Sequence, residues 1–471
     1  MAPDSSSAPA LETCLQSTSR VLQNWNGVIT YQATVVSVCS VEDVQTVVRD
    51  RITYPSPVRA KGSHHSMSDC IVNDGGTVLD MRAFDTIEVD VENKTVTVGA
   101  GVELLEAAKV LASHGLQFYV NIELGAMTLG SGACCGTKDA SYYSRRERKY
   151  EYGQVSSYAV GFKLVDGHGE IVEVSTSRNA ELLPALRSSY GLLGIVCEVT
   201  FQVKELTPVH FEHIEYSLDE FTKDVDTFFD SQHSNMLYLF PFLDKVVVER
   251  RAFGSGKIGH GSRQWKWRNF ARKSFPALAR LTRRLPEPFE FIAIDAYCLL
   301  IIKFLVWVVR GRNSSVVDQI IDYPKKPGSQ AYAFSIWAFE HQHFARIVRE
   351  YFAFCREYYR LTGFRCDLPS VGYGVREDQS ALFSYSRRGN AFTLDPISTG
   401  GEAWERFLHA YNEFCERNGG RPLLNQTRSL LSSQFRASFT LEIPSFIRTR
   451  RRFDPHDRFY NRFFRELLAQ S

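Results

Sequence analysis

Two neighbouring histidines stand at the end of a run of small residues. At the centre of the stretch 58–69 lie Gly62, Ser63, His64, His65 and Ser66. Small side chains let a backbone approach a ligand closely, and consecutive N–H groups in such a loop can hold phosphate oxygens. A histidine in this place adds a nucleophilic ring nitrogen. The stretch is therefore either a ligand-binding loop or a polar surface turn with two solvated histidines.

Two later segments are also rich in glycine. The first, 125–139, contains Thr128, Gly130, Ser131, Gly136 and Thr137, and the second, 188–196, ends in Gly194, Ile195 and Val196. Each glycine costs about 0.5–1 kcal/mol relative to alanine inside a helix or strand. Glycines this dense instead favour a backbone that lies against a flat or phosphorylated ligand.

The elements that must position these segments do not alternate regularly. The apolar and β-branched patterns predict a strand over 28–38 and a helix over 41–49, which a capping box at Ser40 opens. A second strand leads into the histidines. A strand over 77–81, a hairpin over 87–98 and a helix over 102–113 follow. A doubly wound nucleotide-binding fold would alternate strand and helix throughout. The order predicts an α+β fold.

The three glycine-rich segments, in this order and separated by strands, resemble those of the vanillyl-alcohol oxidase family. Arg59, Gly62, His65 and Ser66 fall on the first family pattern, while Ser131 replaces a glycine of the second. The resemblance implies a two-subdomain FAD-binding domain of the p-cresol methylhydroxylase type. It also implies that all three segments contact FAD, and that His65 is the point at which the flavin is joined covalently.

The remainder of the chain is similar to the aldonolactone-oxidase branch of that family. Its closing pattern, Asp-Pro-x-x-x-Phe-x-Asn, occurs at 454–461. This similarity implies an α+β substrate cap with an antiparallel sheet. The expected organisation is a flexible tail over 1–24, the FAD-binding domain over 25–205, the cap over 206–440, and a segment over 441–471 that returns to the FAD-binding domain.

One departure from that branch falls where it supplies a cation beside the flavin. The chain keeps Gly-Gly-Arg-Pro at 419–422 but continues with Leu-Leu-Asn425-Gln426, so Gln426 stands where a lysine is expected. We expect Gln426 and Asn425 to orient a hydroxyl or a flavin carbonyl, with Arg365 as a further catalytic candidate. A capped turn is the alternative for the two amides. Lys138 replaces a histidine of lactone oxidases, so we expect sugar lactones to be poor substrates.

The stretch 263–310 mixes basic and aromatic residues and then becomes almost wholly apolar. Asp295 and Lys303 interrupt the apolar run, and each costs about 2.5–3.5 kcal/mol on membrane-insertion scales. The run is therefore expected to be a buried helix of the cap, with a peripheral membrane contact through 263–310 as the alternative.

Composition limits partners and compartment. The 471 residues carry a net charge of +2, which indicates no nucleic-acid partner. The opening lacks the basic and apolar regions of a secretory signal. Ten cysteines show no metal-binding or disulfide-framework spacing. We therefore expect no metal, thiols that are mostly buried, and a reducing, cytoplasmic location.

The sequence thus predicts an FAD-linked oxidoreductase that oxidises an alcohol-type small molecule, with O2 or an unidentified electron acceptor. The alternatives are a flavin-binding protein without catalysis and a sugar-lactone oxidase or dehydrogenase. A bicovalent flavin oxidase is disfavoured because Gly125 and Ala126 stand where its cysteine would lie. The Gly-x-Gly-x-x-Gly pattern at 254–259 lacks the helix and acidic residue of a dinucleotide site, which predicts a loop.

Overall fold

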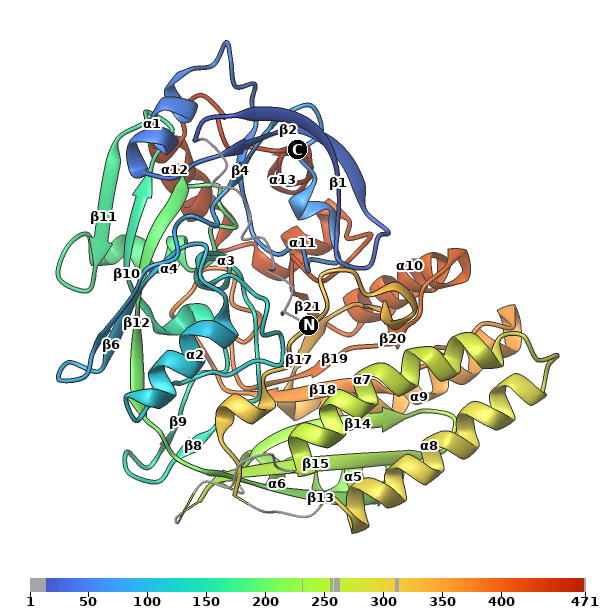
Figure 1. Ribbon diagram of the computed structural model, residues 1–471. Coiled ribbons are helices and arrows are strands. Elements are labelled where there is room, and N and C mark those ends of the chain that lie inside the picture. The colour runs from blue at the N-terminus through green and yellow to red at the C-terminus, as the bar shows by residue number, and fades with distance from the viewer. Residues whose placement is uncertain (1–13, 231, 255–256, 258–262, 310–312, 470–471) are drawn as a thin grey trace, which may run out of the picture.

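The computed structural model describes residues 14–230, 232–254, 257, 263–309 and 313–469 (Figure 1). Most of the glycine pattern at 254–259 therefore lies outside the described residues. Three main sheets organise the molecule, and helices pack on each of them. The predicted α+β class is confirmed.

The N-terminal sheet carries the histidine loop. Its strand order is β1 (Ser17–Gln23), β2 (Thr30–Ser37), β4 (Thr77–Asp80) and β3 (Val58–Lys61), with β4 parallel to both β2 and β3. Helix α1 (Val41–Arg49) follows β2, and the predicted capping box between Ser40 and Asp43 is present. Since β3 ends at Lys61, the loop begins at the edge of this sheet.

The second sheet is wholly antiparallel and carries the other two glycine-rich segments. Its order is β11 (Ile171–Ser175), β10 (Ala159–Val165), β12 (Ile195–Glu205), β6 (Thr95–Gly99) and β5 (Ile87–Asp90), and β7 (Leu116–Phe118) also pairs with β12. The predicted hairpin over 87–98 is confirmed. Its helices are α2 (Leu104–Ser113), α3 (Leu129–Cys134) and α4 (Leu183–Leu186).

The third sheet is antiparallel, as expected of the cap. Its order is β13 (Val209–Ser217), β15 (Lys245–Phe253), β14 (Ser234–Phe240), β18 (Ser370–Val375), β19 (Ala391–Leu394), β17 (Trp337–Glu340) and β21 (Arg421–Pro422). Two-stranded pairs join β8 (Tyr143–Ser144) to β9 (Lys149–Tyr150), and β16 (Ala333–Phe334) to β20 (Ile397–Ser398).

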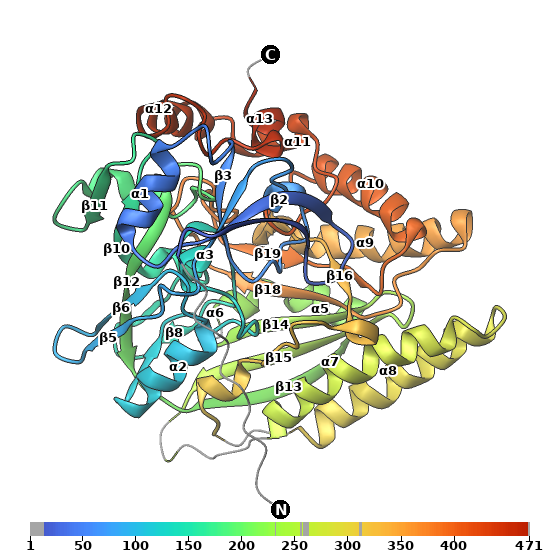
Figure 2. The same ribbon diagram turned by 45° about the horizontal axis from the view of Figure 1, so that its top comes forward.

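Helices cover both faces of the cap sheet, because successive strand residues point to opposite faces. Val246 and Val248 belong to the hydrophobic cluster formed with α5 (Leu218–Asp224), α9 (His341–Thr362) and α10 (Glu402–Arg417). Val247 instead packs with α7 (Arg263–Thr282) and α8 (Phe289–Trp307). The short helix α6 (Thr227–Asp230) lies between α5 and β14. Figure 2 shows α7 and α8 running together along the edge of the molecule.

Residues 263–310 were expected to form either a buried cap helix or a membrane contact, and most of them lie in the helix hairpin of α7 and α8. Ile294, Ile301 and Leu305 are buried against the sheet, whereas Ile292 and Leu300 are 58% and 65% exposed. The hairpin is therefore a cap element with a buried face and an apolar outer face. Among the described residues, no helix combines the length and the apolar character needed to cross a membrane.

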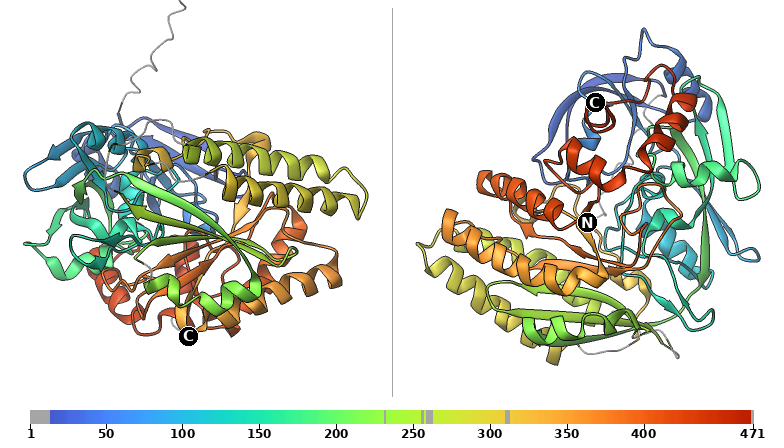
Figure 3. Two further views of the ribbon diagram at one scale, coloured as in Figure 1. Left: turned by 90° about the horizontal axis from the view of Figure 1, so that it is seen from below. Right: turned by 180° about the vertical axis from the view of Figure 1, so that it is seen from behind.

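The C-terminal helices return to the FAD-binding half, as Figure 3 shows from behind. These are α11 (Ser432–Phe439), α12 (Ile443–Phe453) and α13 (Arg462–Leu468), whose apolar residues join the cluster of the first two sheets. Arg458 is buried and donates to the carbonyls of Val47 and Val48 at 2.6 and 2.9 Å. Its own carbonyl accepts from the N–H of Val58, the first residue of β3, at 2.7 Å.

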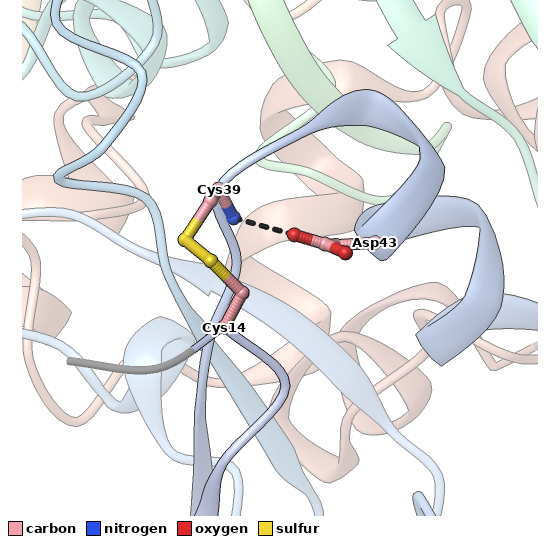
Figure 4. Close-up of side chains that lie close together, drawn as sticks. All are labelled: Cys14, Cys39 and Asp43. Atoms are coloured by element: carbon pink, nitrogen blue, oxygen red, sulfur yellow. Dashed lines mark hydrogen bonds between the residues drawn. A yellow bond between two sulfur atoms is a disulfide. The ribbon is translucent and has the colours of Figure 1, made fainter.

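The N-terminal segment differs from the flexible tail expected over 1–24. Residues 1–13 lie outside the described residues, but β1 occupies Ser17–Gln23, and Cys14 forms a disulfide with Cys39. Asp43 accepts a hydrogen bond from the Cys39 N–H at 2.8 Å (Figure 4). Eight cysteines are free and six of them are buried. The disulfide was not predicted, and it weakens the argument from cysteine use for a reducing compartment.

Residues 330–339 do not form one continuous strand. β16 and β17 are separated at Ser335, whose N–H donates to the carbonyl of Pro396. The segment 380–386 is not a strand. Its backbone pairs with the FAD-binding half instead: the N–H of Phe383 donates to the Ser188 hydroxyl at 3.0 Å.

Candidate functional site

The histidine loop and the second glycine-rich segment touch each other. A Cβ added to Gly62 would lie 2.5 Å from the Ser131 Oγ and 2.9 Å from the Thr128 Oγ1. Both distances are far below van der Waals contact, so only glycine fits where the two segments meet. The third segment is held as closely: Gly194 has a φ of 152°, and its Cβ would lie 2.5 Å from the Val165 carbonyl oxygen.

The three segments together line a cavity of about 140 Å³, here called the loop cavity. Of the predicted cofactor-binding residues, those that line it are Gly62, Ser63, His64, His65, Ser66, Thr128, Gly130, Ser131, Thr137, Gly194 and Val196. Gly136 and Ile195 do not line it. Gly136 faces Leu423, and Ile195 pairs with Val165 inside the sheet. At both positions a neighbouring residue lines the cavity, so the local sequence patterns were wrong by one residue.

The loop cavity contains one buried guanidinium, that of Arg59. It donates to the carbonyls of Tyr190 and Phe459 at 2.5 and 3.2 Å, and burial lowers its pKa. Arg59 follows the first residue of β3, so the sheet fixes its position. A cation held in this way favours an anionic ligand such as a pyrophosphate.

The two histidines have different surroundings. His64 adopts a left-handed φ of 55°, and its ring lies 3.3 Å from the Tyr31 hydroxyl. His65 stacks on Trp25, with ring centroids 5.1 Å apart, and meets Tyr323 edge-on. Burial lowers the pKa of each to about 4. Both rings are therefore neutral near pH 7, which leaves a nucleophilic lone pair on each.

A second cavity, of about 260 Å³, lies between the first two sheets and the cap sheet. We call it the aromatic cavity after the rings in its lining, which are Trp25, Tyr238, Phe240, Trp267, Phe275, Tyr323, Tyr332, Phe334 and Tyr373. The buried faces of α7 and α8 contribute further apolar side chains, including Ala271, Ile301 and Leu305. These residues come from distant parts of the chain, so no local sequence pattern groups them into one cavity.

The two cavities share a wall. His65, Leu124, Thr137 and Gln426 line both of them. Within the described chain, the side-chain oxygens of Thr137 and Gln426, and the Oδ1 of Asn425, are buried without a hydrogen-bond partner. Buried polar atoms that lack a partner cost roughly 1–3 kcal/mol each, so these atoms mark a place where a ligand would supply partners. The residues therefore fit a ligand with polar atoms at this wall, and the flavin expected from the sequence would supply such atoms.

Arg365 lies elsewhere, and its assignment as a catalytic residue must be corrected. Its guanidinium pairs with Asp295 at 2.5 Å and stacks on Phe242 at 3.8 Å from the ring centroid. It lines neither the loop cavity nor the aromatic cavity. The reason is that Asp295, one of the charges inside the apolar run of α8, needs a buried partner.

A different charged pair lines the aromatic cavity. Lys138 Nζ lies 2.8 Å from Asp395 Oδ2, and the two side chains are only 4% and 3% exposed. Lys138 was noted in the sequence only as a departure from lactone oxidases, and Asp395 was missed. A signal was available for Asp395: it directly follows the wholly buried strand Ala391–Leu394.

The comparisons with known proteins agree with this geometry. A sequence model described as "FAD binding domain" matches residues 32–175. The chain is 27% identical over 230 residues to the L-gulonolactone oxidase of Bos taurus, covering 48% of this chain and 50% of that protein. It is 24% identical over 267 residues to the D-arabinono-1,4-lactone oxidase of Eremothecium gossypii, covering 56% and 49%. The chain thus spans about half the length of the curated relatives it matches.

The fold is also shared with solved structures. The crystal structure of cholesterol oxidase from B. sterolicum aligns with a TM-score of 0.76 over 98% of this chain and 99% of that chain, at 16% identity. Fold, loops and sequence match together define a flavoprotein whose cofactor is FAD. More particularly, the part of the chain over 32–175 matches an FAD-binding domain, in the region where the glycine-rich segments predicted one.

Proposed function

We propose that this protein is an FAD-dependent oxidoreductase that oxidises the hydroxyl-bearing carbon of an apolar alcohol. One observation carries the proposal: the loop cavity and the aromatic cavity meet at a wall formed by His65, Leu124, Thr137 and Gln426. A flavin ring at this wall would have its dinucleotide part in one cavity and the substrate in the other. When bound, FAD supplies an acceptor at its N5 for the hydride of the alcohol carbon.

The protein's own residues would then bind the cofactor, orient the substrate and enclose both. The glycines of the loop cavity let the backbone approach the cofactor, and Arg59 offers a positive charge for its pyrophosphate. The partnerless amide oxygen of Gln426 and hydroxyl of Thr137 would orient the ring or the substrate hydroxyl. The rings of the aromatic cavity would exclude water from the reacting carbon.

The lining of the aromatic cavity supports an apolar substrate over a sugar lactone. A sugar lactone carries several hydroxyls, and each would need a partner inside the cavity. The cavity instead offers mainly rings and aliphatic side chains. The two curated relatives described above are lactone oxidases by name, but this chain has Lys138 and Gln426 where that branch has its histidine and lysine.

We further propose that the flavin is linked covalently to His65. Its ring lines the shared wall, and burial keeps it neutral. The His65 ring stacks on Trp25 and meets Tyr323 edge-on, while His64 lies against Tyr31 and lines the loop cavity alone. This difference supports His65 as the attachment point.

A contact with a membrane surface is proposed for the outer face of α7 and α8. Exposed apolar residues of this hairpin include Phe270, Leu281, Phe289, Ile292, Leu299 and Leu300, and Lys266, Lys273 and Arg284 are exposed on it as well. Cationic side chains beside apolar ones favour an anionic lipid surface. Because the inner faces of both helices line the aromatic cavity, such a contact would bring a lipid-dissolved alcohol close to it.

The experiment that tests the oxidoreductase is anaerobic mixing of the purified holoprotein with cinnamyl alcohol, decan-1-ol, cholesterol and L-gulono-1,4-lactone. We expect at least one apolar alcohol to bleach the flavin absorbance, and the lactone to bleach it far more slowly. Flavin that no alcohol bleaches would favour a flavin-binding protein without catalysis. Fast bleaching by the lactone alone would favour a sugar-lactone oxidase.

A further inference from the structure

The Lys138–Asp395 pair is placed unusually for a structural ion pair. Lys138 directly follows Thr137, a residue of the shared wall, and both members of the pair line the aromatic cavity with Gln426. The ammonium lies 2.8 Å from Asp395 Oδ2 and 3.7 Å from the centre of the Tyr373 ring. Lys138 is therefore adjacent in sequence to the flavin wall, as is Glu123, which precedes Leu124.

The pair is also incompletely satisfied. Removing two charges from water costs several kcal/mol per ion, and their attraction offsets this only when the remaining hydrogen-bonding capacity is used as well. Asp395 Oδ1 is buried and has no hydrogen-bond partner among the described residues. An ammonium has three N–H donors, and one of those of Lys138 is bonded to Asp395. The pair thus has a donor and an acceptor for one more polar group.

Burial moves both members toward their neutral forms. It lowers the pKa of Lys138, against the opposing effect of Asp395, and it raises the pKa of Asp395, against the opposing effects of Lys138 and Thr393. A carboxylate whose pKa is raised holds a proton more readily than one in water. That property suits a group that must accept a proton during a reaction.

We propose that the Lys138–Asp395 pair binds the substrate hydroxyl and that Asp395 accepts its proton. This rests on the proposed oxidation of an alcohol. The O–H bond breaks and its proton passes to the Asp395 carboxylate. The C–H bond breaks, its hydrogen and electron pair pass to the flavin, which is the oxidant, and a C=O bond forms. Lys138 stays protonated and holds the hydroxyl oxygen against the carboxylate.

A second buried pair offers a matched control. Lys204 Nζ lies 2.6 Å from Glu151 Oε2 and 3.9 Å from the centre of the Phe253 ring, and the two side chains are 15% and 7% exposed. Burial lowers the pKa of Lys204 and raises that of Glu151. Neither residue lines the loop cavity or the aromatic cavity. The two pairs therefore share their chemistry and differ in their access to substrate.

The test compares Asp395→Asn and Lys138→Met with Glu151→Gln and Lys204→Met in the FAD-loaded protein. Flavin reduction is followed by rapid mixing with the fastest alcohol of the panel above. Binding is measured separately, from the change that cinnamyl alcohol methyl ether, which cannot be oxidised, causes in the spectrum of the oxidised flavin. Thermal unfolding of each variant reports on the fold.

We expect Asp395→Asn to slow the limiting rate of flavin reduction about 100-fold or more while the ether binds with similar affinity. Lys138→Met should weaken ether binding about 10-fold, since it removes a charged hydrogen-bond donor. The control variants should change the unfolding temperature and leave rate and binding as they are. If Asp395→Asn does not fold, the proposal is tested by ether binding to Lys138→Met alone, and unchanged affinity would overturn it.

Equal reduction rates in wild type and Asp395→Asn would overturn this proposal and leave the proposed function standing. Equal effects in both pairs would overturn it as well, because a structural role would then explain them. Wild-type flavin that no alcohol reduces would overturn both the proposed function and this inference.

Discussion

The loop cavity and the aromatic cavity lie side by side but are built in different ways. The first is lined mainly by short contiguous stretches, such as 59–66, in which glycines and small polar residues bring the backbone to the ligand. The second is lined by single side chains from β14, α7, α8, β18 and several loops. The cofactor is thus held largely by local backbone geometry, whereas the substrate space depends on how the cap packs.

This difference assigns separate roles to the two halves. A loop that binds through its backbone can keep one cofactor while the sequence around it changes. A cavity made of scattered side chains changes its contents whenever one of them is replaced. We therefore expect variants of the loop cavity to affect flavin retention, and variants of the aromatic cavity to affect rate and substrate choice.

The largest expected effect separates the two histidines of the loop cavity. Wild-type protein precipitated with acid should keep its flavin, and His65→Ala should release it into the supernatant. His64→Ala is the matched control and should retain the flavin. Absorbance spectra of pellet and supernatant measure the result. Complete release from the wild type would exclude the covalent link, and release from His64→Ala alone would move it by one residue.

Gln426 tests the wall between the cavities. Its amide oxygen is buried without a partner among the described residues, so we expect Gln426→Ala to slow flavin reduction by the true substrate about 10²–10³-fold, as the loss of one hydrogen bond in a closed site does. The flavin spectrum should stay unchanged. Gln434→Ala is the control, because Gln434 is equally buried but lines neither cavity. An unaltered rate in rapid mixing would make Gln426 a turn residue without a role in the chemistry.

Substrate choice tests the aromatic cavity itself. Two lactone hydroxyls left without partners would each cost about 1–3 kcal/mol, and each 1.4 kcal/mol is a factor of ten. We expect kcat/KM for gulono-, galactono- and arabinono-lactones to lie about 100-fold or more below that for the best apolar alcohol. Steady-state assays decide this. Lactone turnover at tens per second, an ordinary enzyme rate, would show that the aromatic lining does not set the preference.

The smallest expected effect concerns the outer face of the helices that wall the aromatic cavity. Sedimentation with vesicles of anionic phospholipid should retain the wild type, and Ile292→Asp with Leu300→Asp should reduce the bound fraction several-fold. Leu361→Asp is the control, since Leu361 is as exposed as Leu300, at 65%, but lies on α9. Equal binding by all three proteins, or none by the wild type, would remove the membrane contact from the proposal.

The parts that the sequence predicted well are those that depend on neighbouring residues. The capping box at Ser40 follows from two residues three positions apart, and the helix over 41–49 was confirmed at both ends. The glycine-rich segments require close backbone approach wherever they lie, and they led to the loop cavity and to FAD. These signals do not depend on how distant segments pack.

The parts that were missed depend on distant partners. Asp395 can be recognised as a site residue only in the folded chain, where it follows β19 and contacts Lys138, 257 positions away in the sequence. Arg365 looked available for chemistry because its partner Asp295 is 70 positions away. The disulfide joins Cys14 to Cys39 without any framework spacing. No local pattern pairs these residues with their distant partners, so only the assembled fold shows the pairs.

The anchor that Arg458 provides for β3 has a consequence for the order of events in the cell. The strand leading into the histidine loop gains a backbone partner from a residue that is synthesised 400 positions after Val58. At roughly 5–20 residues per second, a ribosome needs about 20–80 seconds to cover that distance. The histidine loop is therefore translated early, but the strand that leads into it gains this hydrogen bond only after Arg458 has been made. Loading of the flavin is expected to follow synthesis of Arg458, so that newly made protein passes through a cofactor-free stage whose length depends on the cellular supply of FAD.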